Sequence, residues 1–101
     1  MKYLDEVRVM NDNYVSEGVK KGDVGTIIFS WITYDCFEVV FSDHSGKDYA
    51  EILINVADLE LVEDCGLTDE EILEDLPRND PKCWCKYEGG KIYNLLGEVK
   101  K

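Results

Sequence analysis

The side chains best suited to metal chemistry in this sequence are its four cysteines, Cys36, Cys65, Cys83 and Cys85. Zinc sites commonly use two cysteines separated by two residues, with a second pair of cysteines or histidines completing four ligands. Cys83 and Cys85 are separated by a single residue, and neither a second pair nor a neighbouring histidine accompanies them. We therefore expect no metal ion and no other cofactor, and predict free, partly buried thiols that pack as small apolar side chains.

The polar side chains that could catalyse a reaction stand in unsuitable surroundings. His44, the one histidine, lies in 43–47, a segment typical of a tight turn, with no nucleophile in a plausible pocket beside it. None of Ser30, Ser42 and Ser45 lies in a nucleophile-elbow motif, and no glycine-rich phosphate loop is present. Carboxylates are abundant, but a catalytic pair needs a pocket that shifts its pKa values. We predict that the protein is not an enzyme.

The distribution of charge is the feature that points most directly to a function. The 101 residues include 22 acidic and 11 basic ones, which gives a formal net charge of −11. From Asp48 to Pro77 there are 11 acidic residues and no lysine or arginine, so this segment carries the whole excess. An acidic surface disfavours binding to nucleic acid or to an anionic membrane. It is either a solvated face or a surface for a basic protein, whose lysines and arginines would relieve the self-repulsion.

The residues predicted to contact such a partner all belong to the acidic segment. They are Asp58, Glu60, Glu63, Asp64, Asp69, Glu70, Glu71, Glu74 and Asp75. An alternative site consists of three aromatic residues, Tyr14, Trp31 and Tyr34, because a proline-rich peptide ligand would need aromatic side chains of this kind. The opposing interpretation is that Trp31 belongs to the core and that the two tyrosines cover it.

These side chains must be positioned by short strands. Alternating apolar and polar residues, with many β-branched and aromatic side chains, predict strands over 3–10, 24–31, 37–42, 49–54 and 59–62. A long turn-rich loop follows the first strand, and a single 3₁₀ turn is expected just before the last. Gly25 is predicted to mark a bulge or a close approach of backbone. The residues expected to be mostly buried are Val24, Ile27, Phe29, Val39, Phe41 and Ile52.

Three segments of these strands, 21–28, 37–41 and 57–62, resemble the SH3-like small barrel. The ordering also resembles a bacterial family of small SH3-like proteins, some of which look like immunity proteins, the antidotes paired with toxins. The resemblance covers residues 4–63 and implies a mainly β fold with a five-stranded SH3-like barrel. It also implies that the function is binding to a toxin, although one barrel fold can serve many tasks.

A helix and a hairpin are predicted after the barrel. Thr68 and Glu71 have the spacing of a capping box, and Leu67 and Ile72 occupy the apolar positions around it, which predicts a helix over 69–76. Two strand-like segments flanking Gly89-Gly90 are typical of a two-residue hairpin.

The domain organisation expected from these elements is a single domain in two parts. Residues 1–65 form the barrel, and residues 66–101 add the helix and hairpin packed on it. No secretory signal or membrane-spanning run is apparent, so we expect a cytoplasmic protein. The favoured hypothesis is an immunity or antitoxin protein that neutralises a basic, nuclease-like toxin through its acidic surface. The alternative is an SH3-like adaptor or regulatory module that binds a peptide or a subunit of a larger assembly.

Overall fold

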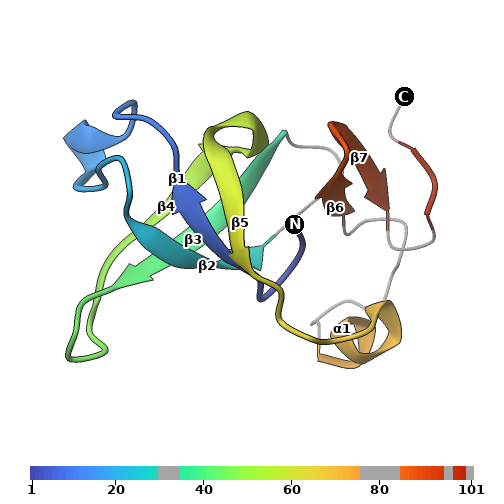
Figure 1. The fold of residues 1–101 in the computed structure, drawn as a ribbon. Coiled ribbons are helices and arrows are strands. Elements are labelled where there is room, and N and C mark those ends of the chain that lie inside the picture. The colour runs from blue at the N-terminus through green and yellow to red at the C-terminus, as the bar shows by residue number, and fades with distance from the viewer. Residues whose placement is uncertain (30–34, 76–84, 95–96, 100–101) are drawn as a thin grey trace.

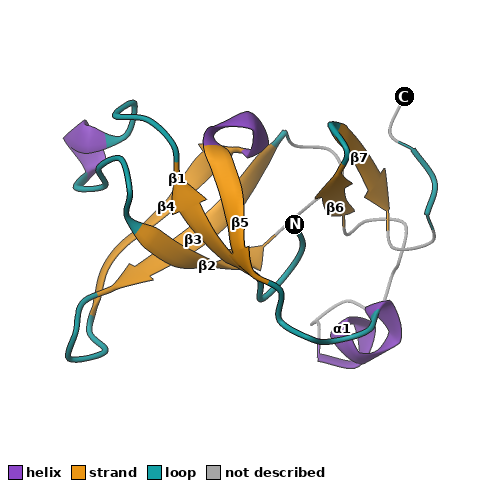
Figure 2. Cartoon of the chain, viewed as in Figure 1, coloured by secondary structure: helices purple, strands orange, loops and turns teal. Residues whose placement is uncertain are grey.

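The computed structural model describes residues 1–29, 35–75, 85–94 and 97–99, and it is mainly β (Figures 1 and 2). The elements are β1 (Glu6–Val9), η1 (Val15–Glu17), β2 (Val24–Phe29), β3 (Cys36–Ser42), β4 (Asp48–Asn55), η2 (Val56–Asp58), β5 (Leu59–Glu63), α1 (Asp69–Asp75), β6 (Cys85–Glu88) and β7 (Lys91–Asn94). The prediction of five strands, a 3₁₀ turn, a helix and a hairpin is therefore confirmed in its order along the chain. No helix in the described ranges has the length and apolar character needed to cross a membrane.

The main sheet has five antiparallel strands in the order β4-β3-β2-β1-β5. The first four strands form a meander, and β5 returns after η2 to pair with β1, so that β1 and β5 lie side by side (Figure 1). In the part of the chain that the structure describes, no ladder joins β4 to β5, and these two strands are the edges of the sheet. The hairpin of β6 and β7 is a separate two-stranded sheet.

The core lies on the inner face of the curved sheet, where alternate residues of each strand point. The fully buried apolar side chains include Val7, Ile27, Phe37, Phe41 and Ile54. In β4, Tyr49 and Leu53 alternate with these inward positions and are 47% and 57% exposed. The expected alternation in β3 and β4 is thus confirmed.

Three of the six residues expected in the core are buried as predicted, and three are not. Ile27, Val39 and Phe41 are fully buried, whereas Phe29 and Ile52 are only partly buried. Val24 was expected inside, and that prediction is wrong, because the residue is 40% exposed. Its neighbour Gly25 points inward, so the two-residue period of the strand turns Val24 outward.

Gly25 is a point of close approach, as its position in the strand predicted. A Cβ atom there would lie 2.6 Å from the carbonyl oxygen of Val40 and 2.7 Å from Cγ1 of Val39. The register shift in β2 falls elsewhere, between Ile27 and Phe29. The glycine therefore lets β3 pack closely, and the bulge is a separate feature farther along β2.

The capping box and the apolar contact around it begin α1 as predicted. The backbone nitrogen of Glu71 donates to Oγ1 of Thr68 at 3.2 Å, and the backbone nitrogen of Thr68 donates to Oε1 of Glu71 at 3.3 Å. Ile72 is fully buried, and Leu67, Phe29 and other partly buried side chains pack against it. This contact holds the short helix to the sheet.

The hairpin has the register expected for a turn at Gly89-Gly90. Glu88 lies opposite Lys91, and Tyr87 lies opposite Ile92. Tyr87 also exchanges two backbone hydrogen bonds with Met1, at 2.6 and 2.7 Å. The hairpin and the start of the chain are therefore joined, and Tyr87 and Ile92 pack against the main core.

Candidate protein-binding site

The first long loop is fastened to the turn before β5 by Tyr14 and Asp58. The Tyr14 hydroxyl donates to Oδ2 of Asp58 at 2.7 Å and accepts from the backbone nitrogen of Asn55 at 3.0 Å. The side-chain nitrogen of Asn11 donates to Oδ1 of Asp58 at 2.8 Å. Burial, together with the bond to Asp58, raises the pKa of Tyr14. Both residues therefore serve the fold, and the carboxylate of Asp58 is already engaged.

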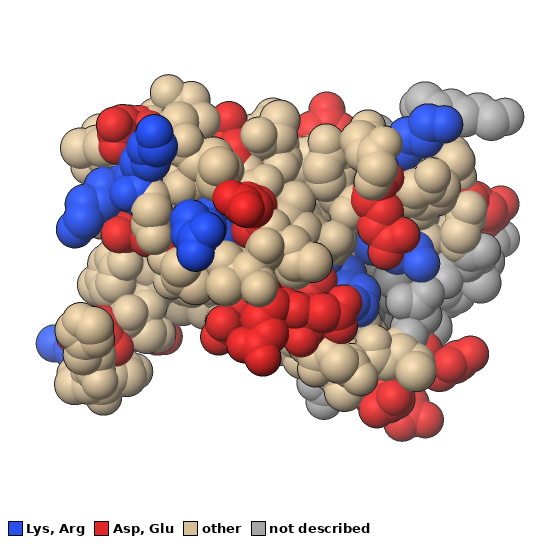
Figure 3. Space-filling model, viewed as in Figure 1, with Lys and Arg blue, Asp and Glu red and all other residues tan. Residues whose placement is uncertain are grey.

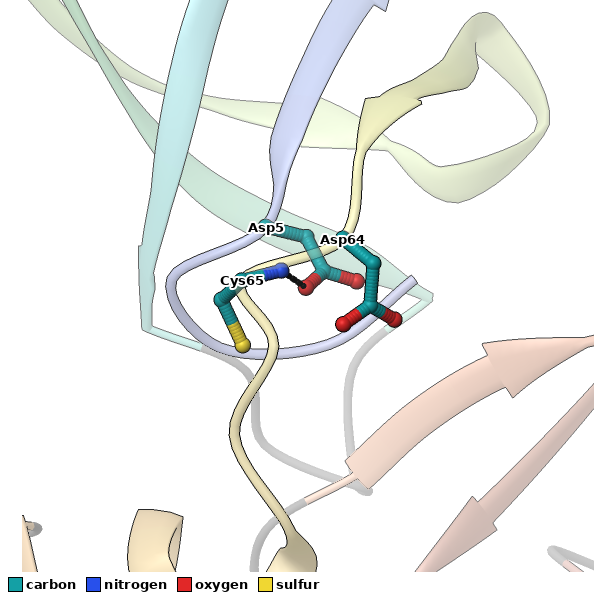
Figure 4. Close-up of side chains that lie close together, drawn as sticks. All are labelled: Asp5, Asp64 and Cys65. Atoms are coloured by element: carbon teal, nitrogen blue, oxygen red, sulfur yellow. Dashed lines mark hydrogen bonds between the residues drawn. The ribbon is translucent and has the colours of Figure 1, made fainter.

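A second cluster joins the start of the chain to the segment after β5. Asp5 is almost completely buried, and its carboxylate accepts from the backbone nitrogens of Lys2 at 3.0 Å and Cys65 at 2.9 Å. The Lys2 ammonium lies 2.8 Å from Oδ2 of Asp64 and 3.4 Å from Oδ1 of Asp5. Figure 4 shows the two carboxyl groups side by side beside Cys65. One lysine thus contacts two acids from distant parts of the sequence.

The electrostatics of this cluster follow from the position of Lys2. Burial alone lowers the pKa of Lys2, but the hydrogen bond to Asp64 and the charge of Asp5 more than offset that effect, so the pKa lies above its ordinary value. The same bond to Lys2, with the backbone N–H of Gly66, lowers the pKa of Asp64. Both groups are therefore charged over a wide range of pH.

The carboxylates of Asp5 and Asp64 and the sulfur of Cys65 lie within 4.8 Å of one another, which is close enough to share a cation. The Lys2 ammonium already contacts both carboxylates. Burial raises the pKa of Cys65 and so disfavours the thiolate that a metal would need. The ammonium of Lys2 therefore accounts for the close approach of the two carboxylates.

An open groove of about 350 Å³ lies beside this cluster, between the ends of β1 and β5 and the segment that leads to α1. It combines apolar and acidic side chains. Its lining residues are Leu4, Glu6, Glu63, Asp64, Cys65 and Leu67. Figure 3 shows acidic atoms gathered below the ends of these strands, with further acidic atoms over α1 on the same face.

The structure divides the acids predicted from the sequence into those with a partner within the fold and those without one. Asp58, Asp64 and Glu71 accept hydrogen bonds within the fold, as described above. Glu60 is half-exposed and lies 3.8 Å from the guanidinium of Arg8. The predicted acids that are exposed and have neither a side-chain hydrogen bond nor a salt bridge to any described residue are Glu63, Glu70 and Glu74. Asp69 and Asp75 belong to α1, and their side chains lie outside the description.

The other residues singled out in the sequence lie away from the groove or outside the described residues. Trp31, Tyr34 and Cys83 lie outside the described residues, so the aromatic groove is represented by Tyr14 alone. His44 is exposed in the turn between β3 and β4. Cys85 is buried in β6. The thiol pKa of Cys36 is raised by burial and by nearby carboxylates, as befits a packing residue.

Cys65 and Leu67 were not predicted as site residues, and neither were four residues of the groove and the neighbouring cluster at the start of the chain, Lys2, Leu4, Asp5 and Glu6. These four lie about sixty residues from their partners after β5, and nothing local in the sequence pairs them. The only available signal was the pattern of the first strand, which did not reveal its partner. No family model, curated protein or solved structure matches this chain.

Proposed function

We propose that this protein is an immunity-type binding protein, which neutralises a basic, nuclease-like toxin by docking on it through an acidic face. The groove at the ends of β1 and β5, beside the segment that leads to α1, carries the proposal, because it brings exposed acids and apolar side chains together on one surface. Carboxylates there would contact the lysines and arginines with which the toxin holds nucleic acid phosphates. Such pairs contribute on the order of several kcal/mol at close protein interfaces and accelerate association.

We further propose that the five-stranded sheet is an SH3-like barrel. The strand order supports this assignment, because β5 returns to the first strand after a single 3₁₀ turn and the sheet curls around one core. A small barrel of this kind presents loops and strand ends as binding surfaces.

The adaptor alternative has weaker support. It relies on Tyr14, Trp31 and Tyr34, and the hydroxyl of Tyr14 is engaged by Asp58 and Asn55. The Tyr14 side chain is half-buried and packs against the core, which is the behaviour of a covering residue.

The test begins with affinity purification of the bound protein from the source organism, followed by its identification. The recovered protein is then expressed in a susceptible host, with and without this chain. We expect the partner to be basic and to arrest growth, and co-expression of this chain to restore growth. A partner that does not affect growth, or whose toxicity persists on co-expression, would refute the immunity function.

A further inference from the structure

Two acids of the groove lie opposite each other on neighbouring strands. Glu6 of β1 lies directly opposite Glu63 of β5. Both side chains are exposed, and both line the groove. Like charges directly opposite each other destabilise a sheet. Neither carboxylate forms a salt bridge with a lysine or arginine of the described residues.

A β-bulge creates this pair. Residues 7–9 of β1 face residues 61, 60 and 59 in regular register, so a regular ladder would place Val62 opposite Glu6. The register shifts between Glu6 and Val7, and the extra residue brings Glu63 opposite Glu6 instead. Bulges are over-represented at sheet edges and next to functional sites, where they redirect a side chain or end the pairing. The repulsive pair is therefore built into the strand geometry.

A neighbouring pair of carboxylates in the same part of the fold already binds a cationic side chain. The ammonium of Lys2 lies between the carboxylates of Asp5 and Asp64, and its side chain is only 12% exposed. Lysine and arginine cover apolar surface with their stems while the charged ends reach polar groups. The groove offers both surfaces, because Leu4 and Leu67 accompany the acids.

We propose that the groove receives an arginine of the protein partner, placed between apolar residues, with its guanidinium bridging Glu6 and Glu63. Several N–H groups in a planar fork allow one guanidinium to serve two carboxylates. The neighbouring apolar residues of the partner pack on Leu4 and Leu67. This inference deepens the proposed function, since it rests on a basic protein partner and names the contact that the partner makes.

The test uses a short peptide and therefore does not depend on the toxin. The probe is a blocked tripeptide of leucine, arginine and leucine, titrated into the ¹⁵N-labelled full chain while backbone amide shifts are recorded. We expect saturating shifts at Glu6, Glu63 and Leu67. A matched peptide with citrulline, the neutral isostere of arginine, should bind at least tenfold more weakly.

The variants locate the contact. The double variant Glu6→Gln with Glu63→Gln should weaken binding at least tenfold, and its unchanged shift pattern elsewhere reports that the fold is kept. The matched control, Glu70→Gln with Glu74→Gln, removes two exposed acids from α1 and should leave the affinity within twofold. Equal binding of the citrulline peptide, or shifts confined to α1, would overturn the proposal. Failure of growth rescue with peptide binding intact would refute the immunity function alone.

Discussion

The hydroxyl of Tyr14 donates to the carboxylate of Asp58 at 2.7 Å and joins two segments 44 residues apart in sequence. Because it also accepts from Asn55, its removal leaves a donor and an acceptor without this partner. We expect Tyr14→Phe to lower the free energy of unfolding by about 1–2 kcal/mol. Urea unfolding followed by circular dichroism measures the change. Tyr49→Phe is the matched control, since its longer 3.3 Å bond to Asp23 is exposed, and an equal loss there would contradict the assignment.

Phe41 tests the position of the core. Its side chain is fully buried on the inner face of β3. Phe41→Ala should cost about 3–5 kcal/mol, because it removes buried surface and leaves a cavity. Leu53→Ala, at a position 57% exposed on the outer face, should change stability by less than about 0.5 kcal/mol. Similar losses for the two variants in urea unfolding would be inconsistent with an inner position for Phe41 and an outer position for Leu53.

The ion pair of Lys2 and Asp64 predicts a pH dependence. The folded-state pKa of Asp64 is lowered, so its stabilising contribution is present above the unfolded value of about 3.9 and is lost as the pH falls through the folded value. The pKa of Lys2 is raised, so its contribution is present below its unfolded value of about 10.4 and is lost as the pH rises through the folded value. The pair therefore stabilises the fold between about pH 4 and 10.

The Lys2→Met variant tests whether Lys2 is the cause of the lowered pKa of Asp64. We expect the midpoint of the Asp64 carboxyl titration, followed by NMR, to move upward towards its ordinary value. Asp43 is the internal control, because hydrogen bonds from Ser45 and from the backbone of Lys47 lower its pKa. An Asp64 midpoint that stays where it was would show that Lys2 is not the cause.

The local features of the fold could be predicted because their determinants lie within a few residues. The capping box joins Thr68 to Glu71, three residues away, and the hairpin turn consists of two adjacent glycines. The alternation that buries Phe37, Val39 and Phe41 is also visible in the chain itself. These elements depend on backbone preferences and side-chain period alone.

The groove could not be predicted, since it depends on register between distant strands. Glu6 meets Glu63 only because a bulge adds one residue to β5, and no local pattern marks that insertion. The sequence predicts that Asp64 contacts a partner, but the ammonium of Lys2, 62 residues away, already binds its carboxylate. Strand pairing decides which acids remain available to bind a partner, whereas the amino-acid composition gives only the total number of acids.

The Glu6 and Glu63 pair predicts that stability and binding change in opposite directions. Glu63→Lys replaces a repulsive cross-strand pair with an attractive one, which should raise the free energy of unfolding by about 0.2–1 kcal/mol. The same change places a positive charge where the partner's arginine is expected. Urea unfolding and binding to the identified partner are measured together. A variant that is less stable than the parent would contradict the repulsion between the two carboxylates. A variant that binds the partner as tightly as the parent would contradict the role of this pair in binding.

Reversal of the exposed helix acids tests the wider acidic face. Glu70→Lys with Glu74→Lys leaves the capping residue Glu71 in place, so each change should alter stability by less than about 0.5 kcal/mol. The on-rate for the partner should fall by on the order of tenfold at low salt, because like charges now meet during encounter. Rising salt should slow the parent towards the variant, since it screens exposed charges.

Comparison of the two reversals separates the roles of the groove and the helix. A contact in the groove should affect mainly the dissociation rate, because it forms in the bound complex, whereas charges on α1 should affect mainly the association rate. Surface plasmon resonance at low and high salt measures both rates, and circular dichroism verifies the fold. If both reversed proteins associate and dissociate as the parent does, the acidic segment is a solvated face. The aromatic site of Tyr14, Trp31 and Tyr34 would then become the leading candidate for partner binding.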